Sequence, residues 1–248
     1  MKNIRELENI AVLIDADNAQ SSKIKLILDE ISAYGRVTVK KAFGNWKDPI
    51  LKNWEDVVKS LAIKPEQQFA YTKGKNATDI LLIINALDLL HTNNYDAFVL
   101  VASDSDYTPL AIRLRESGVF VLGVGEKKTP ESFKNACDEF LLTENLKGTD
   151  TEVELSENKS SIPESLEQAD IEEVHKLLVM AYEKYQDDDG YVNVSSAGTY
   201  IKRIKPDFDA LTYGFAKLPD LLQNYPNKYE IKKYKGKGTV NIIAYKCK

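Results

Sequence analysis

Two short apolar runs, each followed directly by aspartates, constrain this chain more than any other feature. Residues 10–14 (Ile-Ala-Val-Leu-Ile) lead into residues 15–18 (Asp-Ala-Asp-Asn), and residues 98–101 (Phe-Val-Leu-Val) lead into residues 102–106 (Ala-Ser-Asp-Ser-Asp). An apolar run of this length, rich in Val and Ile, is typical of a strand buried on both faces of a parallel sheet. Ligands of such sheets bind just beyond the carboxyl ends of the strands. Both runs therefore predict carboxylates at the edge where chemistry is expected.

The strongest candidates for that chemistry are Asp15, Asp104 and Asp106, because they follow strands and do not lie on a solvated helix face. Asp79 is a fourth candidate, at the start of a predicted helix. Carboxylates packed together repel and raise each other's pKa, so such a cluster usually needs a cation. This favours a hard divalent metal, Mg²⁺ or Mn²⁺.

Some of these residues also have simpler interpretations. Asp79 could serve only as a favourable charge in the first turn of its helix. Asn18 could orient a carboxylate or a metal-bound water, or it could cap the segment that follows. Asp17 alternates with Asp15, so its side chain points away if the strand continues, and it ranks second.

The composition is that of a soluble globular protein, with 43% hydrophobic and 29% charged residues. The two cysteines, Cys137 and Cys247, lie far apart and support neither a disulfide framework nor a zinc site. No N-terminal segment has the order of a signal peptide. The most apolar stretch, residues 80–90, is too short to cross a bilayer, which needs about 20 residues. We therefore expect a cytoplasmic protein.

The first domain, residues 1–146, alternates predicted strands with predicted helices. The patterns predict strands at 10–14, 37–39, 68–71, 98–101 and 119–124, and helices at 21–34, 53–61, 77–90, 108–117 and 131–140. This alternation predicts an α/β fold, a parallel sheet with helices on both faces.

Residues 147–170 are acidic, lack periodicity and contain few large apolar side chains, which predicts a flexible linker. Residues 171–248 are mildly basic and form the second predicted domain. Its patterns predict helices at 171–185, from 195 or 196 to 205, and at 208–222, a short strand at 191–194, and a hairpin of strands 229–234 and 240–245. Three helices closed by a hairpin predict a winged helix.

Three motifs in order resemble the NYN domain, a branch of the PIN-like metal-dependent nucleases. They are residues 14–18 (Ile-Asp-Ala-Asp-Asn), 73–79 (Lys-Gly-Lys-Asn-Ala-Thr-Asp) and 103–110 (Ser-Asp-Ser-Asp-Tyr-Thr-Pro-Leu), and residues 133–140 are similar to the closing helix of the family. The resemblance implies a PIN-like parallel sheet and hydrolysis of RNA phosphodiester bonds. It also implies that Mg²⁺ or Mn²⁺ is held by Asp15, Asp79, Asp104 and Asp106, with Asn18 in support.

The second domain resembles the LOTUS (OST-HTH) winged helix through residues 209–222 (Asp-Ala-Leu-Thr-Tyr-Gly-Phe-Ala-Lys-Leu-Pro-Asp-Leu-Leu). This resemblance implies binding of RNA or of a protein partner. The candidate RNA contacts are Lys73, Lys75 and Arg113 in the first domain and Lys232, Lys233, Tyr234, Lys235 and Lys237 in the predicted hairpin. The hairpin lysines could instead protect a strand edge, Lys73 and Lys75 could be solvated loop residues, and Arg115 could replace Arg113.

Two other functions remain open at this point. Asp15-Ala16-Asp17 is also similar to the start of a haloacid-dehalogenase-type phosphatase, although Asn18-Ala19 fits that family poorly. The first domain could alternatively be a catalytically silent adaptor that binds RNA or protein. The expected partner is RNA, either single-stranded or structured.

Overall fold

The computed structural model describes residues 7–69, 76–146, 164–235 and 241–248. The chain divides into two compact units, Met1–Thr151 and Glu152–Lys248. Each unit has a sheet and a hydrophobic core of its own.

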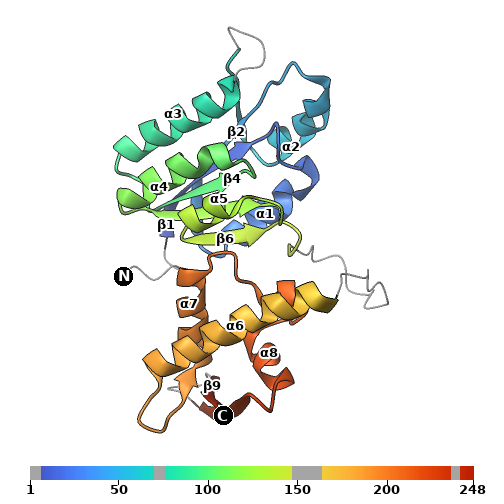
Figure 1. The fold of residues 1–248 in the computed structure, drawn as a ribbon. Coiled ribbons are helices and arrows are strands. Elements are labelled where there is room, and N and C mark those ends of the chain that lie inside the picture. Colours follow the sequence, from blue (N-terminus) through green and yellow to red (C-terminus); the bar gives the residue numbers. More distant parts are fainter. Residues whose placement is uncertain (1–6, 70–75, 147–163, 236–240) are drawn as a thin grey trace. The chain divides into compact units, whose positions relative to one another are not determined.

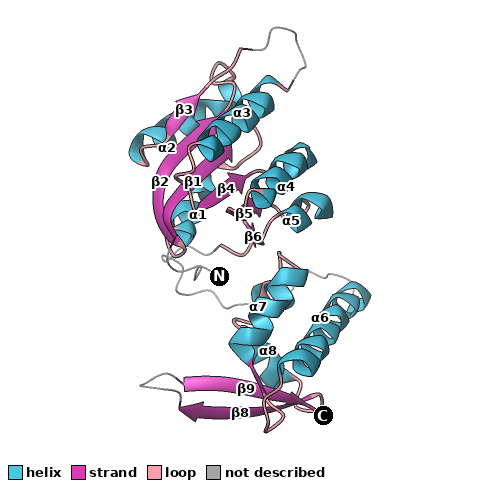
Figure 2. Ribbon diagram, turned by 90° about the vertical axis from the view of Figure 1, so that its left-hand side faces the viewer, coloured by secondary structure: helices cyan, strands magenta, loops and turns pink. Residues whose placement is uncertain are grey.

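The first unit is built on a six-stranded sheet with the strand order β3-β2-β1-β4-β5-β6 (Figures 1 and 2). Every neighbouring pair of strands is parallel. The strands are β1 (Leu7–Asp15), β2 (Gly35–Phe43), β3 (Lys64–Glu66), β4 (Ala97–Val101), β5 (Phe120–Gly125) and β6 (Glu139–Leu142). The chain first moves from β1 toward β3 and then returns to the other side of β1. The strand order therefore reverses at β1 and β4, the position where open parallel sheets bind ligands.

Helices cover both faces of this sheet, as predicted (Figure 1). One face carries α3 (Ala77–His91), α4 (Thr108–Glu116) and α5 (Glu131–Ala136), and the other carries α1 (Ile24–Ile31) and α2 (Trp54–Ser60). The side chains of β1 alternate between the two cores: Leu13 packs on the α3 side, and Val12 and Ile14 pack on the α1 side. This alternation directs Asp15, two residues after Leu13, to the α3 side.

Two elements of the first unit differ from the sequence prediction. The strand predicted at 68–71 is replaced by the earlier strand β3, and residues 70–71 lie outside the described residues. The helix predicted at 131–140 ends at Ala136, and Glu139–Leu142 forms β6. The carboxylate of Asp138 accepts hydrogen bonds from the Val121 amide (2.9 Å) and from Arg115 (3.1 Å), which fixes the chain beside β5. This tertiary contact overrides the helical pattern.

The second unit has the helices and the small antiparallel sheet of a winged helix (Figure 2). Its elements are α6 (Glu164–Tyr185), β7 (Val192–Asn193), α7 (Val194–Ile204), α8 (Leu218–Asn224), β8 (Tyr229–Lys235) and β9 (Asn241–Cys247). The helix α6 begins within the segment 147–170 for which the sequence predicted a linker. The helix predicted at 208–222 is interrupted: a 3₁₀ turn, Ala210–Tyr213, ends at Gly214, whose positive φ of 81° leaves the helical region.

Candidate functional site

Asp15 is the buried centre of the candidate site. It is the last residue of β1, its side chain is 0% exposed, and its Oδ2 accepts a 2.8 Å hydrogen bond from the Asn18 side chain. Its Oδ1 is buried and has no hydrogen-bond partner among the described residues. Burial raises the pKa of Asp15 to about 6. The negative charges of Asp79 and Asp17 also raise this pKa, and the hydrogen bond from Asn18 lowers it. The described residues therefore compensate the charge of an ionised Asp15 poorly.

Asp79 is joined to this centre through Tyr107. Asp79 lies in the first turn of α3, and its Oδ1 accepts a 2.6 Å hydrogen bond from the Tyr107 hydroxyl. Tyr107 is fully buried, and its ring lies 6.4 Å from that of Phe133. Burial and the charges of Asp15 and Asp79 raise the pKa of the Tyr107 hydroxyl, so it stays protonated and remains a donor. Tyr107 thus holds one oxygen of Asp79 beside Asp15.

Asp104 and Asp106 follow β4 and are exposed. Asp104 precedes a 3₁₀ turn, Ser105–Tyr107, and its Oδ1 accepts a 2.9 Å hydrogen bond from the Asp106 amide. Asp106 Oδ2 accepts a 3.1 Å hydrogen bond from the side chain of Asn76, directly before α3. The β4 carboxylates are therefore connected to the start of the helix that carries Asp79.

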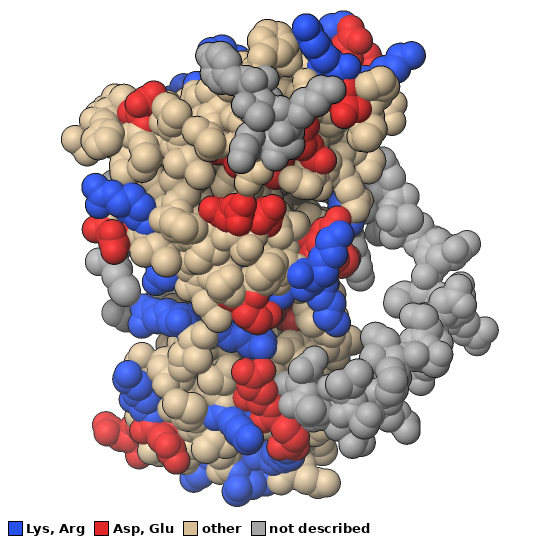
Figure 3. Space-filling view, turned by 45° about the horizontal axis from the view of Figure 1, so that its top comes forward, with Lys and Arg blue, Asp and Glu red and all other residues tan. Residues whose placement is uncertain are grey.

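These contacts place the predicted acidic residues at the carboxyl ends of β1 and β4 and at the start of α3. Figure 3, which turns the top of Figure 1 toward the viewer, shows acidic side chains near the middle of the visible surface of the first unit and most basic side chains toward its rim. Within the described ranges, no three His, Cys, Asp or Glu side chains lie close enough to hold a metal ion as they stand. The ligand chemistry nevertheless fits a hard divalent cation, since the available ligands are carboxylate oxygens and no described residue donates a hydrogen bond to the buried Oδ1 of Asp15.

Sequence reasoning did not single out Tyr107 as a functional residue. The only sequence signal for it is its position directly after the aspartates that follow β4. Asp17, ranked second from the sequence, is exposed, and its Oδ1 accepts a 3.0 Å hydrogen bond from the Asn45 amide in the loop after β2. Its carboxylate thus connects two loops at the same edge of the sheet.

The basic residues expected to contact RNA have several different environments. Lys73, Lys75 and Lys237 lie outside the described residues, and Lys235 lies in β8 with its side chain undescribed. Arg113 is exposed on α4, 3.9 Å from Glu116. Arg115 contacts Asp138 and the backbone carbonyls of Asn135 and Ala136, so it joins α4 to α5.

In the hairpin of the second unit, the Lys232 side chain contacts an acidic and an aromatic residue. Its Nζ lies 3.6 Å from Asp189 and 4.9 Å from the centre of the Tyr191 ring. Lys233 and Tyr234 are exposed. Of these three residues, Lys233 and Tyr234 therefore offer the more accessible groups.

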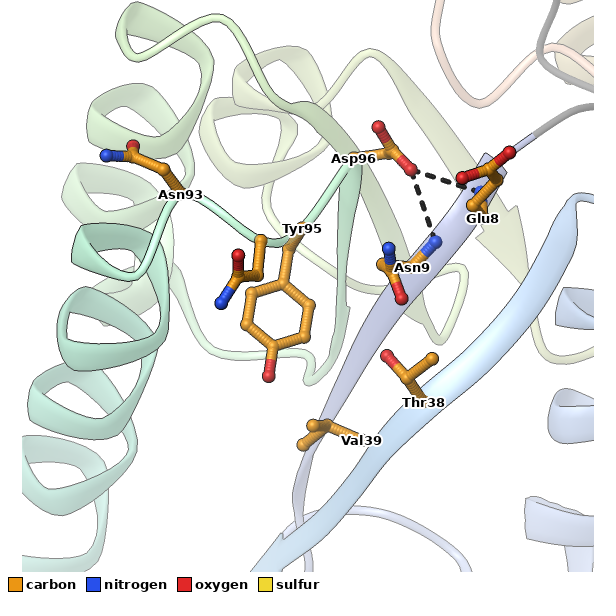
Figure 4. A pocket seen from close by; sticks show the side chains of 8 residues that line it. Glu8, Asn9, Thr38, Val39, Asn93, Tyr95 and Asp96 are labelled. Carbon is orange, nitrogen blue, oxygen red and sulfur yellow. Dashed lines mark hydrogen bonds between the residues drawn. The ribbon is translucent and has the colours of Figure 1, made fainter.

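A hollow of about 500 Å³ lies at the opposite end of the sheet from the aspartates. Figure 4 shows its lining from the amino-terminal ends of β1 and β4, the turn after α3, and β2. One carboxylate oxygen of Asp96 accepts hydrogen bonds from the amides of Glu8 (3.1 Å) and Asn9 (3.2 Å), so it holds the start of β1 in place. Asp96 therefore has a structural role here, far along the strands from Asp15.

Both units of the chain match known domain families. The model of the NYN domain matches residues 9–144, and the model of the OST-HTH/LOTUS domain matches residues 168–241. The NYN domain belongs to the PIN-like nuclease superfamily. The chain belongs to the NYN domain family, and its NYN domain is followed by an OST-HTH/LOTUS domain, in the order expected from the motifs.

Individual proteins add little to this assignment. No curated protein matches the chain. A crystal structure of a protein of unknown function from Vibrio parahaemolyticus is similar at 17% identity, covers 56% of this chain and 94% of its own, and has a TM-score of 0.46. The solution structure of an uncharacterized protein from Nitrosomonas europaea has 23% identity, covers 41% and 88% of the two chains, and has a TM-score of 0.28.

The family assignment makes this an RNA-related, nuclease-like protein. In the described part of the chain, no helix has both the length and the apolar character needed to cross a membrane.

Proposed function

We propose that the protein is a metal-dependent ribonuclease whose site is formed by Asp15, Asp79, Asp104 and Asp106. The observation that carries the proposal is the buried carboxylate of Asp15, which has an oxygen without a hydrogen-bond partner among the described residues and lies beside Asp79 at the point where the strand order reverses. A stable fold gains nothing from an unsatisfied buried carboxylate, because burying charge without a partner costs free energy. Such a group is expected where function requires it.

In this proposal the four aspartates hold Mg²⁺ or Mn²⁺. The bound ion would neutralise charge on the phosphoryl oxygens and help generate the attacking hydroxide from water. Asn18 orients Asp15 through its amide, and Tyr107 orients Asp79 through its hydroxyl. Asp104 and Asp106 are exposed at the end of β4, where a phosphodiester can approach.

The proposal is tested by incubating purified protein with RNA in Mn²⁺, Mg²⁺ or EDTA, and in parallel with a chromogenic phosphomonoester. We expect RNA cleavage only with the divalent cation, and no phosphomonoester hydrolysis. Phosphomonoester hydrolysis without RNA cleavage would favour the phosphatase alternative. Binding of RNA without cleavage in either metal would favour a silent adaptor.

Divalent metal should also stabilise the protein. A ligand that binds only the folded state contributes about 2.7 kcal/mol at 100 times its Kd. For a unit of this size, that corresponds to a rise in Tm of about 5 to 10 °C. Titrating Mn²⁺ against thermal unfolding in a chelator-treated sample measures the effect. A Tm that stays constant up to millimolar Mn²⁺ would argue against a metal site among these aspartates.

We further propose that the two domains have separate functions. Residues 1–146 form the NYN nuclease domain, and the acidic stretch that ends where α6 begins at Glu164 acts as a linker. The rest of the chain, through residue 248, forms the LOTUS winged helix that holds RNA or a protein partner. The exposed Lys233 and Tyr234 are consecutive in β8 and therefore point to opposite faces of the sheet. Each supports RNA contact at the hairpin by itself, because a lysine can pair with a phosphate and an aromatic ring can stack on a base.

If the hairpin binds RNA, the candidate lysines Lys232 and Lys233 of β8 should contribute unequally. Lys233→Ala should weaken RNA binding by the full chain and reduce the slope of log K against log salt by about 0.7, the value for one phosphate of a single strand. Lys232→Ala is the matched control and should have a smaller effect, because its ammonium already contacts Asp189 and Tyr191. Unchanged binding in both variants, measured at low salt in EDTA, would indicate that the hairpin docks a protein or only protects a strand edge.

A further inference from the structure

An exposed aromatic ring with a lysine over it lies at the same edge of the sheet as the aspartates. Phe69 follows β3, and its side chain is 58% exposed. Lys47 follows β2, and its Nζ lies 4.6 Å from the centre of the Phe69 ring. Both residues come after the carboxyl ends of neighbouring parallel strands, so they share an edge with Asp15 (Figure 2).

The loops that carry this pair are connected to each other and to the end of β1. Asp17 Oδ1 accepts a hydrogen bond from the Asn45 amide (3.0 Å), and the Asn45 side chain accepts one from Gln67 (3.3 Å). The indole of Trp46 donates to the carbonyl of Glu66 (2.8 Å). These bonds hold the segment before Phe69 in a defined position relative to the strand that delivers Asp15.

Packing does not account for the exposure of Phe69. Burial of such a ring would contribute hydrophobic free energy, whereas the exposed cation–π contact with Lys47 contributes about 0.5–1 kcal/mol. Single exposed apolar side chains are common, so exposure by itself does not indicate a site. Phe69 differs from the exposed aliphatic side chains because it is a flat ring with a cation over it. The same two groups, a flat ring and a cation, are the ones that proteins use to bind a single nucleic acid strand.

We propose that Phe69 and Lys47 form a nucleotide subsite in which Phe69 stacks on an unpaired base and Lys47 contacts the adjoining phosphate. The inference rests on the proposed function and names its substrate class as single-stranded RNA. A base within a duplex is already stacked between its neighbours, so it is not available to a side chain. Phenylalanine has no polar group with which to read a base edge, so the subsite tolerates any base.

The inference is tested by binding, measured in EDTA so that the readout does not depend on turnover. Full-length wild type and Phe69→Ala protein are titrated against a fluorescent single-stranded oligoribonucleotide and against a blunt RNA duplex of the same length. Phe69→Ala should weaken binding of the single strand by about 5- to 150-fold, the range for loss of one stacked base. Phe69→Tyr should retain wild-type binding of the single strand. Duplex binding should be the same in all variants.

Ile50→Ala is the matched control, because Ile50 is 80% exposed on the neighbouring segment Pro49–Asn53 and has no flat ring. It should bind the single strand as the wild type does. The inference is overturned if Phe69→Ala binds the single strand normally, if the duplex shows the same loss, or if Ile50→Ala loses as much. These outcomes are independent of the proposed function, which fails if the wild type does not cleave RNA in Mn²⁺.

Discussion

Replacing Asp15 with Asn should abolish RNA cleavage while leaving the protein folded. Asn retains the shape of the side chain and removes the charge that would hold a divalent cation. Mutation of a residue that only orients a metal ligand typically lowers metal affinity or activity by about 10- to 100-fold. Loss of the charge of a ligand itself should therefore reduce the rate of cleavage by more than about 100-fold. The initial rate of cleavage in saturating Mn²⁺ measures the effect. Wild-type activity in Asp15→Asn would contradict this assignment.

The same substitution should stabilise the metal-free protein at neutral pH. The pKa of Asp15 is raised to about 6 from its ordinary value of 3.8. The folded state therefore binds the Asp15 proton more tightly than the unfolded state does. The resulting contribution to the free energy of unfolding is fully present below about pH 4 and is lost as the pH rises through 6. At about 1.4 kcal/mol for each pKa unit, the free energy of unfolding that is lost approaches 3 kcal/mol at pH 7.5. Asp15→Asn does not ionise, so it should exceed the wild type in unfolding free energy at pH 7.5 by up to that amount.

Urea unfolding in EDTA at pH 5 and pH 7.5 tests this pH dependence. The exposed residue Asp29, which pairs with Lys25 at 3.4 Å, provides a control: Asp29→Asn should keep the wild-type pH dependence. If Asp15→Asn is more stable than the wild type but inactive, the Asp15 carboxylate serves function and not folding. If Asp15→Asn is instead less stable at pH 7.5, Asp15 is a structural residue.

Replacing Tyr107 with Phe should weaken Mn²⁺ binding by about 10- to 100-fold, as expected for the loss of a group that orients a metal ligand. The ring would still fill its buried position against Phe133, but Asp79 would lose its 2.6 Å hydrogen bond and its fixed orientation. Isothermal titration with Mn²⁺ measures the change without reference to activity. The control is Tyr95→Phe, at the hollow on the opposite edge of the sheet. Equal Mn²⁺ affinity in wild type and Tyr107→Phe would contradict the proposed orientation of Asp79.

The sequence predicted the framework of the first unit well, because its signals are local. The apolar runs of β1 and β4 are typical of buried strands, and their alternation with helical patterns indicates a parallel sheet. The strand β6 was wrongly predicted as the end of a helix, because its position depends on the contact of Asp138 with β5. The interruption at Gly214 was also missed, since the neighbouring apolar residues continue the helical spacing.

The candidate site was harder to predict from the sequence, because it too depends on contacts between residues that are distant in the chain. The aspartates were found from strand ends and from family motifs, and the structure places them at one edge of the sheet. The bonds between Tyr107 and Asp79 and between Asn76 and Asp106 join residues about 30 positions apart, and no local pattern encodes them. Phe69 gave no signal, because an exposed phenylalanine and a core phenylalanine look the same in a sequence.

If the aspartates and a divalent cation together cleave RNA, replacement of Asp104 with Asn should remove the activity. Asp104→Asn removes a charge but retains an oxygen that can accept the hydrogen bond from the Asp106 amide, so the turn after β4 should persist. A time course with end-labelled single-stranded RNA compares wild type and Asp104→Asn, each in Mn²⁺ and in EDTA. We expect cleavage products only from the wild type in Mn²⁺. Equal cleavage by Asp104→Asn in Mn²⁺, or by the wild type in EDTA, would contradict it.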